Sequence, residues 1–156
     1  MTKAVLLGAL CLLLAGCGSG DDGDDTGSAM IASGTLTGKV GGVIWTLAAA
    51  QTDSFLSDDT EFWVDLYLAA PTGCGSQGTG NSVILTVPNK LGSHALSLQL
   101  NGTFVLDNAA QDNLVATDGA IRVDEITDTR IRGGVTMTFD TANSISGEFE
   151  ATICPP

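Results

Sequence analysis

Between Ile31 and Ile153, apolar residues alternate with Thr, Ser, Asp and Gly, and turn-forming residues interrupt this pattern at short intervals. In an amphipathic helix the apolar residues would recur every three to four positions, whereas alternation gives a strand one buried and one exposed face. About eight to ten short strands of this kind are typical of a β-sandwich or a small barrel. We therefore predict an all-β, antiparallel β-sandwich, with a small β-barrel as the alternative.

Two hairpins define the ends of this predicted domain. The first turns at Gly41-Gly42, and its buried face pairs Val40 with Val43, Gly38 with Trp45 and Leu36 with Leu47. In this pairing Gly38 leaves room for the indole of Trp45. The last hairpin turns at 141–143, with Asn143 in the left-handed conformation, and its buried face pairs Phe139 with Ile145, Met137 with Gly147 and Val135 with Phe149.

The strands expected between the hairpins are 62–68, 83–87, 96–100, 103–106 and 121–126. Pro88 ends the second of them, because proline cannot donate a hydrogen bond to a neighbouring strand. A turn at Asn101-Gly102 connects the third to the fourth.

The first sixteen residues have a different character. Lys3 supplies one positive charge, an apolar run extends from Ala4 to Leu14, and small residues follow. This order is typical of a secretory signal peptide. The run is too short to span a bilayer, which takes about 20 apolar residues.

The run ends in four residues, Leu14, Ala15, Gly16 and Cys17, that resemble the lipobox of bacterial lipoproteins. The resemblance implies cleavage before Cys17, a diacylglyceryl group on its thiol and an acyl chain such as palmitate on the new amine. At roughly 0.8 kcal/mol per buried CH₂, two or three such chains hold a protein on a membrane. The expected partner is thus the lipid bilayer, through Cys17. In the lipoproteins that this motif resembles, Asp directly after the lipidated cysteine signals inner-membrane retention. Gly18 stands there instead, so the resemblance implies the outer membrane.

Three segments follow from this interpretation: a signal peptide (1–16), a lipidated cysteine with a disordered linker (17–30) and a single β-sandwich domain (31–156). The linker sequence 18–28 has no apolar residue and predicts a flexible, acidic spacer. Its four aspartates, Asp21, Asp22, Asp24 and Asp25, lack the spacing of an EF-hand. We expect no metal site there, and weak calcium binding stays open.

Cleavage removes 16 of 156 residues and leaves 140, with 5 basic and 18 acidic side chains and a formal charge of −13. Such a surface argues against nucleic acid as a partner. It also means that acyl chains, rather than a basic patch, attach the protein to an anionic membrane. Arg130 and Arg132 stand among acids and are expected to form cross-strand ion pairs.

Cys11 leaves with the signal peptide and Cys17 is lipidated, so Cys74 and Cys154 remain. An even pair in an exported protein predicts a disulfide. The alternative is a catalytic or metal-binding thiol, but neither cysteine has a Cys-x-x-Cys partner or a neighbouring histidine. His94 is the only histidine, and there is no Gly-x-Ser-x-Gly motif, so we expect no catalytic residues, no cofactor and no enzymatic activity.

The segment from Asp53 to Tyr67 combines acidic and aromatic residues and could be a carbohydrate-binding or calcium-dependent adhesive loop. Its candidate ligand-binding side chains are Asp58, Asp59, Glu61, Trp63 and Tyr67. Aromatic rings can stack on a ligand while carboxylates accept its hydrogen bonds. The plain alternative is an exposed loop that leads into a core strand. Two further functions stay open: a polysaccharide hydrolase that uses two of the clustered acids Asp58, Asp59, Glu61 and Asp65, and a calcium-stabilised adhesion module.

The Gly-Gly-Val-Ile-Trp opening and the Ile-Ser-Gly-Glu-Phe-Glu-Ala-Thr-Ile-Cys ending resemble small, uncharacterised β-rich lipoproteins of Gram-negative bacteria. The resemblance implies location and fold class, and it carries over no site residue. The sequence therefore predicts a membrane-anchored envelope lipoprotein whose β-domain has a non-enzymatic binding or structural role.

Overall fold

The computed structural model describes residues 30–155, which contain eleven strands and no helix. The predicted signal peptide, the lipobox residues Leu14 to Cys17 and the linker before Met30 lie outside the described residues. The strands are β1 (Thr37–Val40), β2 (Val43–Thr46), β3 (Ala49–Asp53), β4 (Glu61–Tyr67), β5 (Ser82–Pro88), β6 (Gly92–Ala95), β7 (Gly102–Val105), β8 (Asn113–Ala116), β9 (Asp118–Ile126), β10 (Arg130–Asp140) and β11 (Asn143–Thr152). Within 30–155, no helix could cross a membrane.

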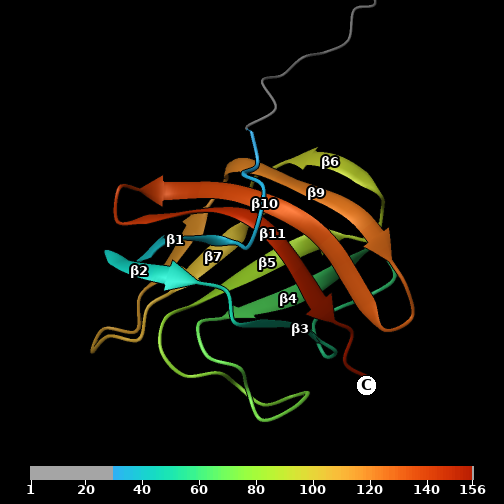
Figure 1. Ribbon diagram of the computed structural model, residues 1–156, viewed down its shortest axis with the longest axis horizontal. Coiled ribbons are helices and arrows are strands. Elements are labelled where there is room, and N and C mark those ends of the chain that lie inside the picture. The colour runs from blue at the N-terminus through green and yellow to red at the C-terminus, as the bar shows by residue number, and fades with distance from the viewer. Residues whose placement is uncertain (1–29, 156) are drawn as a thin grey trace, which may run out of the picture.

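All eleven strands belong to one sheet, in the order β6-β9-β10-β11-β3-β4-β5-β7-β8, with β1 attached to β11 and β2 to β1. The sheet is open and strongly curled (Figure 1), so β5 approaches β9 and β8 approaches β10 across the interior. The all-β fold class is confirmed, and the two layers expected of a sandwich are opposite halves of this one curled sheet. Neighbouring strands are antiparallel except β11 and β3, which meet in parallel at Thr152 and Gln51.

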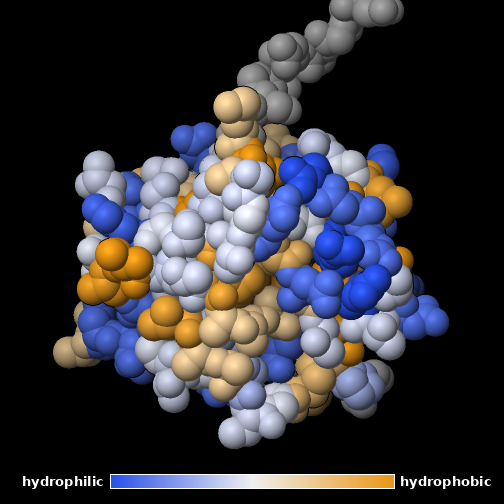
Figure 2. Space-filling view, viewed as in Figure 1, coloured by the Kyte–Doolittle hydropathy of each residue, from blue (hydrophilic) through white to orange (hydrophobic). Residues whose placement is uncertain are grey.

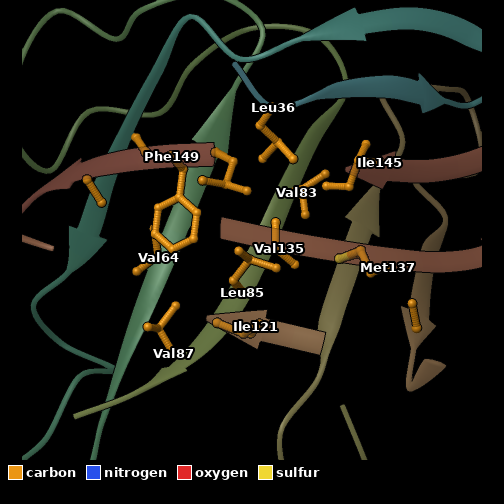
Figure 3. Packing of buried hydrophobic residues seen from close by; sticks show 14 of the residues in the cluster. Leu36, Val64, Val83, Leu85, Val87, Ile121, Val135, Met137, Ile145 and Phe149 are labelled. Atoms are coloured by element: carbon orange, nitrogen blue, oxygen red, sulfur yellow. The ribbon is translucent and has the colours of Figure 1, made fainter. Parts of the chain in front are cut away.

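The core fills the interior of the curl. Val64 on β4 and Leu85 on β5 face Ile121 on β9, Val135 on β10 and Phe149 on β11 (Figure 3). Val64, Leu85, Ile121 and Val135 are fully buried, because alternation along each strand directs every second side chain into the interior. Burial of apolar surface from both halves holds the curl closed.

The first hairpin has the predicted register, with Val40 opposite Val43 and Gly38 opposite Trp45. The structure adds a second reason for glycine at position 38. A Cβ there would lie 2.8 Å from the Cα of Ile145 on β11, so Gly38 makes room for a neighbouring backbone. Close packing of β1 on β11 is what attaches the first hairpin to the sheet.

The predicted register of the last hairpin is wrong. Met137 pairs with Ile145 and Val135 pairs with Gly147, so each partner lies two residues nearer the turn than expected. The turn itself has two residues, 141–142, rather than three. Because the shift is an even number of residues, the same side chains of β11 still face the core.

Side-chain hydrogen bonds explain this tighter turn. The Oδ1 atom of Asp140 accepts hydrogen bonds from the backbone N of Ala142 (2.8 Å) and from Nδ2 of Asn143 (2.9 Å). Asn143 is buried and keeps a negative φ, and its Oδ1 accepts a hydrogen bond from the backbone N of Gly41 (2.7 Å). Phe139 lies at the resulting bulge and is 49% exposed instead of buried.

The predicted strand 96–100 is also absent. The chain forms β6 before it, which contains His94, and then a tight turn in which the Ser97 Oγ accepts hydrogen bonds from the backbone N of Gln99 (3.2 Å) and Leu100 (3.1 Å). Leu98 is 80% exposed at the tip of this turn. A local serine hydrogen bond thus prevails over the alternating pattern.

Leu85 and Leu98 form a matched pair for testing the core. Replacing Leu85 with Ala leaves a cavity between the two halves of the sheet, and we expect a loss of about 2–5 kcal/mol in the free energy of unfolding. Leu98→Ala removes the same atoms from the surface, and we expect a change within about 0.5 kcal/mol. Urea unfolding followed by tryptophan fluorescence measures both. Equal effects of the two substitutions would contradict this core.

Candidate functional site

A cleft of about 360 Å³ lies on the outer face of β3 and β4. The β4–β5 connection and the C-terminal residues after β11 border it, and the turn that follows β3 forms part of its rim. The residues that line the cleft include Gln51, Asp53, Phe55, Asp65 and Tyr67.

The wall of the cleft is held by contacts between three distant segments. Cys74 and Cys154 lie at disulfide-bonding distance, with their Cα atoms 5.5 Å apart, as predicted. The backbone N of Cys154 donates a hydrogen bond to Oγ1 of Thr52 on β3 (2.8 Å). Nearby, Nε2 of Gln51 donates to the carbonyl oxygen of Ser76 (2.9 Å). The loop around Cys74 and the C-terminal segment are thereby fastened to β3.

Alternation along β4 decides which of its side chains face the cleft. Val64 and neighbouring residues of the same parity are in the core, so Trp63, Asp65 and Tyr67 lie on the outer face. On β3, Asp53 lies opposite Trp63 and Gln51 opposite Asp65. Asp53 and Asp65 are consequently diagonal neighbours on one face of the sheet.

The two carboxylates and the tyrosine influence one another. Burial raises the pKa of Asp65, the negative charge of Asp53 adds to this effect, and the hydrogen bond from the Tyr67 hydroxyl to Oδ2 of Asp65 (3.1 Å) opposes it. Burial together with the charge of Asp65 raises the pKa of Tyr67 to about 12. In the described part of the chain, no basic side chain pairs with Asp53 or Asp65. The cleft is therefore acidic and has no internal cation.

Asp53 also shapes the rim. Its Oδ1 accepts hydrogen bonds from the backbone N of Phe55 (2.8 Å) and of Leu56 (3.3 Å), and its carbonyl oxygen accepts one from the Ser57 hydroxyl (2.6 Å). This turn projects the phenyl ring of Phe55 outward, and the residue is 97% exposed. An exposed aromatic ring beside an acidic cleft offers a ligand both an apolar surface and hydrogen-bond acceptors.

Of the five side chains proposed from the sequence, the cleft contains only Tyr67. Asp58 is exposed and closes its own loop, because Oδ1 accepts hydrogen bonds from the backbone N (2.7 Å) and the hydroxyl of Thr60, which lower the pKa of Asp58. Asp59 is exposed as well. Glu61 accepts a hydrogen bond from Nε1 of Trp63 (3.2 Å), so these two flank the cleft on the face of β4 that it occupies.

Gln51 lies outside the segment 53–67 that was predicted as a binding loop, and Asp53 and Phe55 lie within it without having been candidates themselves. The alternation of residues 61–67 is a signal that places Asp65 beside Trp63 and Tyr67, and Asp65 was noted there only as one of several clustered acids. No local pattern shows that the loop around Cys74 covers β3, because that contact joins segments far apart in the chain.

A second group of charged side chains lies on β9, β10 and β11, where hydrophilic side chains gather in Figure 2. Arg130 contacts Glu125 (3.0 Å), and Arg132 contacts Glu125 (3.6 Å) and Glu150 (3.4 Å). The expected cross-strand ion pairing is confirmed. Its members are largely exposed, and such pairs contribute about 0–1 kcal/mol each, so we assign them no binding role.

Among residues 30–155, no three His, Cys, Asp or Glu side chains are grouped as metal ligands. Comparison with known proteins finds no matching family, no matching curated protein and no matching solved structure. The cleft therefore has to be interpreted from its own geometry.

The raised pKa of Asp65 predicts a pH-dependent effect on stability. The folded state binds the Asp65 proton more tightly than the unfolded chain does, so the fold loses stability as pH rises from the ordinary pKa of aspartate to the raised pKa of Asp65. We expect Asp65→Asn to raise the melting temperature at about pH 7 and to lose this advantage near pH 3, below the ordinary pKa of aspartate.

Asp58→Asn is the matched control, because the pKa of Asp58 is lowered instead. This substitution should lower the melting temperature at neutral pH and have little effect in acid. Calorimetry over this pH range measures both variants. A pH-independent effect of Asp65→Asn would contradict the electrostatic description of the cleft.

Proposed function

We propose that the protein is a lipid-anchored envelope protein, attached through Cys17, whose β-domain binds a ligand in the cleft without chemically altering it. The observation that carries the proposal is the cleft itself, in which two carboxylates without a cationic partner lie beside the exposed ring of Phe55. A concave site with an apolar surface and a few polar groups is the usual form of a binding site.

Binding is better supported than hydrolysis. A glycoside hydrolase needs two free carboxyl groups, one as acid and one as base or nucleophile. Asp65, with its raised pKa, suits the role of acid. Asp53, however, already accepts two backbone hydrogen bonds that hold the turn carrying Phe55. Its carboxylate has a structural task, and this favours a binding cleft over a catalytic pair.

The described chain starts at the end of the domain opposite the β4–β5 connection, which borders the cleft. The backbone N of Ala32 donates a hydrogen bond to Oγ of Ser146 (2.9 Å), and this contact fixes the start of the described chain against β11. In Figure 1 this start lies at the top, whereas the β4–β5 connection lies at the bottom. A chain anchored at Cys17 would thus enter the domain at the end opposite this connection, and we place the anchor in the outer membrane.

The anchor is tested by comparing Cys17→Ala with Cys11→Ala, which removes a thiol from the predicted signal peptide. We expect the wild-type protein and Cys11→Ala to stay with the membrane fraction and to need detergent for extraction. Intact mass should show the loss of residues 1–16 and the gain of acyl chains. Cys17→Ala should lack the acyl chains. A native protein with the mass of the unmodified full chain would overturn the proposal.

A further inference from the structure

We infer that the ligand of the cleft is a neutral sugar, bound as one or two rings with an apolar ring face against Phe55 and hydroxyl groups directed at Asp65. This inference rests on the proposed function and specifies its ligand class. Three properties of the described cleft support it: its surface chemistry, its charge and its size.

The surface chemistry matches a ring that is apolar on one face and rich in hydroxyl groups around its edge. Phe55 presents an exposed aromatic ring at the rim. Behind it, Asp65 offers acceptors, while the hydroxyl of Ser54 and the side-chain amide of Gln77 each offer donors and acceptors. A sugar hydroxyl both donates and accepts hydrogen bonds, so it can use this mixture fully. A simple cation would use only the acceptors.

The charge of the cleft selects against anionic ligands. Its lining contains Asp53 and Asp65 but no Lys or Arg, and the three arginines of the chain are engaged with acids on β9–β11. A carboxylated sugar would add a third negative charge to a partly buried pair, which is unfavourable at low dielectric. A neutral sugar avoids this repulsion and can still donate a charge-assisted hydrogen bond to Asp65.

The size of the cleft limits the length of ligand that can be enclosed. Its volume of about 360 Å³ lies near the lower end of the range typical of small-molecule sites. One wall is closed by the segment that carries Cys74, and Gly78 in the same connection packs on the ring of Tyr67. We therefore expect recognition of a terminal unit or a short stretch, rather than of a long chain along its whole length.

The two tryptophans provide a built-in reporter. Trp45 is fully buried in the core, and its Nε1 donates a hydrogen bond to the carbonyl oxygen of Asn81 (3.0 Å). Trp63 lies on the outer face, opposite Asp53. A ligand in the cleft should change the emission of Trp63 and leave that of Trp45 unchanged, so the signal should disappear in Trp63→Phe.

The test titrates the detergent-purified, lipidated protein with neutral oligosaccharides, namely cellotriose, maltotriose, triacetylchitotriose and galactobiose. Digalacturonic acid serves as the anionic counterpart of galactobiose, and spermidine and calcium chloride serve as cationic probes. Fluorescence gives the affinity, and calorimetry confirms it for variants without the reporter. We expect saturable binding of at least one neutral oligosaccharide and weaker binding of the anionic counterpart.

Phe55→Ala and Asp65→Asn should each weaken the binding by about tenfold or more. Phe139→Ala is the matched control, since Phe139 is also exposed but lies at the β10–β11 turn, and it should leave the affinity unchanged. Because Phe55 is almost fully exposed, its replacement does not threaten folding, and circular dichroism checks the fold of Asp65→Asn.

The inference is overturned if none of the neutral sugars binds, or if binding is insensitive to both cleft substitutions. Saturable binding of spermidine or calcium that depends on Asp65, without sugar binding, would overturn the sugar class but retain the binding function. Release of new reducing ends from a bound oligosaccharide would instead overturn the non-enzymatic proposal and retain the sugar class.

Discussion

The attachment of the C-terminal segment to β3 is the contact on which both the fold and the cleft depend. β11 and β3 share a single parallel pair, Thr152 and Gln51, which is the shortest pairing between neighbouring strands of the sheet. The hydrogen bond from Cys154 to Thr52 and the link from Cys154 to Cys74 reinforce this point. They join the half of the sheet that contains β9–β11 to the half that contains β3–β5.

The same attachment builds the cleft. The link to Cys74 draws the β4–β5 connection over the outer face of β3 and β4, where Gln51 binds the backbone of Ser76. Val64 on the inner face of β4 remains in the core. Because side chains alternate along the strand, β4 contributes to the core with one face and to the cleft with the other. Burial under the loop is also what raises the pKa of Asp65. The stability of the fold and the chemistry of the cleft are thus coupled through one short segment.

The sequence predicted those features that depend on local pattern. Alternation predicted the all-β class and the pairing of Gly38 with Trp45, and the pair of remaining cysteines predicted the link between Cys74 and Cys154. The predictions failed where a polar side chain closes its own turn, as Asp140 does in the last hairpin and Ser97 does after β6. Such hydrogen bonds depend on the conformation of a few residues, so the order of apolar and polar residues does not predict them.

The site was predicted only in part for a different reason. Trp63 and Tyr67 belong to the correct strand face, because their spacing follows the alternation of β4. Asp58 looked similar in sequence, but its carboxylate is used within its own loop. The contribution of Gln51 and Phe55 depends on how the loop around Cys74 and the C-terminal segment meet over β3, which is a long-range contact.

The stability of Cys74→Ser tests most directly whether the link at Cys154 holds the two halves together. The link closes a loop of 80 residues, and its removal should cost about 4 kcal/mol in the free energy of unfolding. Urea unfolding of the variant beside the oxidised wild type should show this loss, and reduction of the wild type should reproduce it. A free energy of unfolding within about 0.5 kcal/mol of the wild-type value would contradict the account.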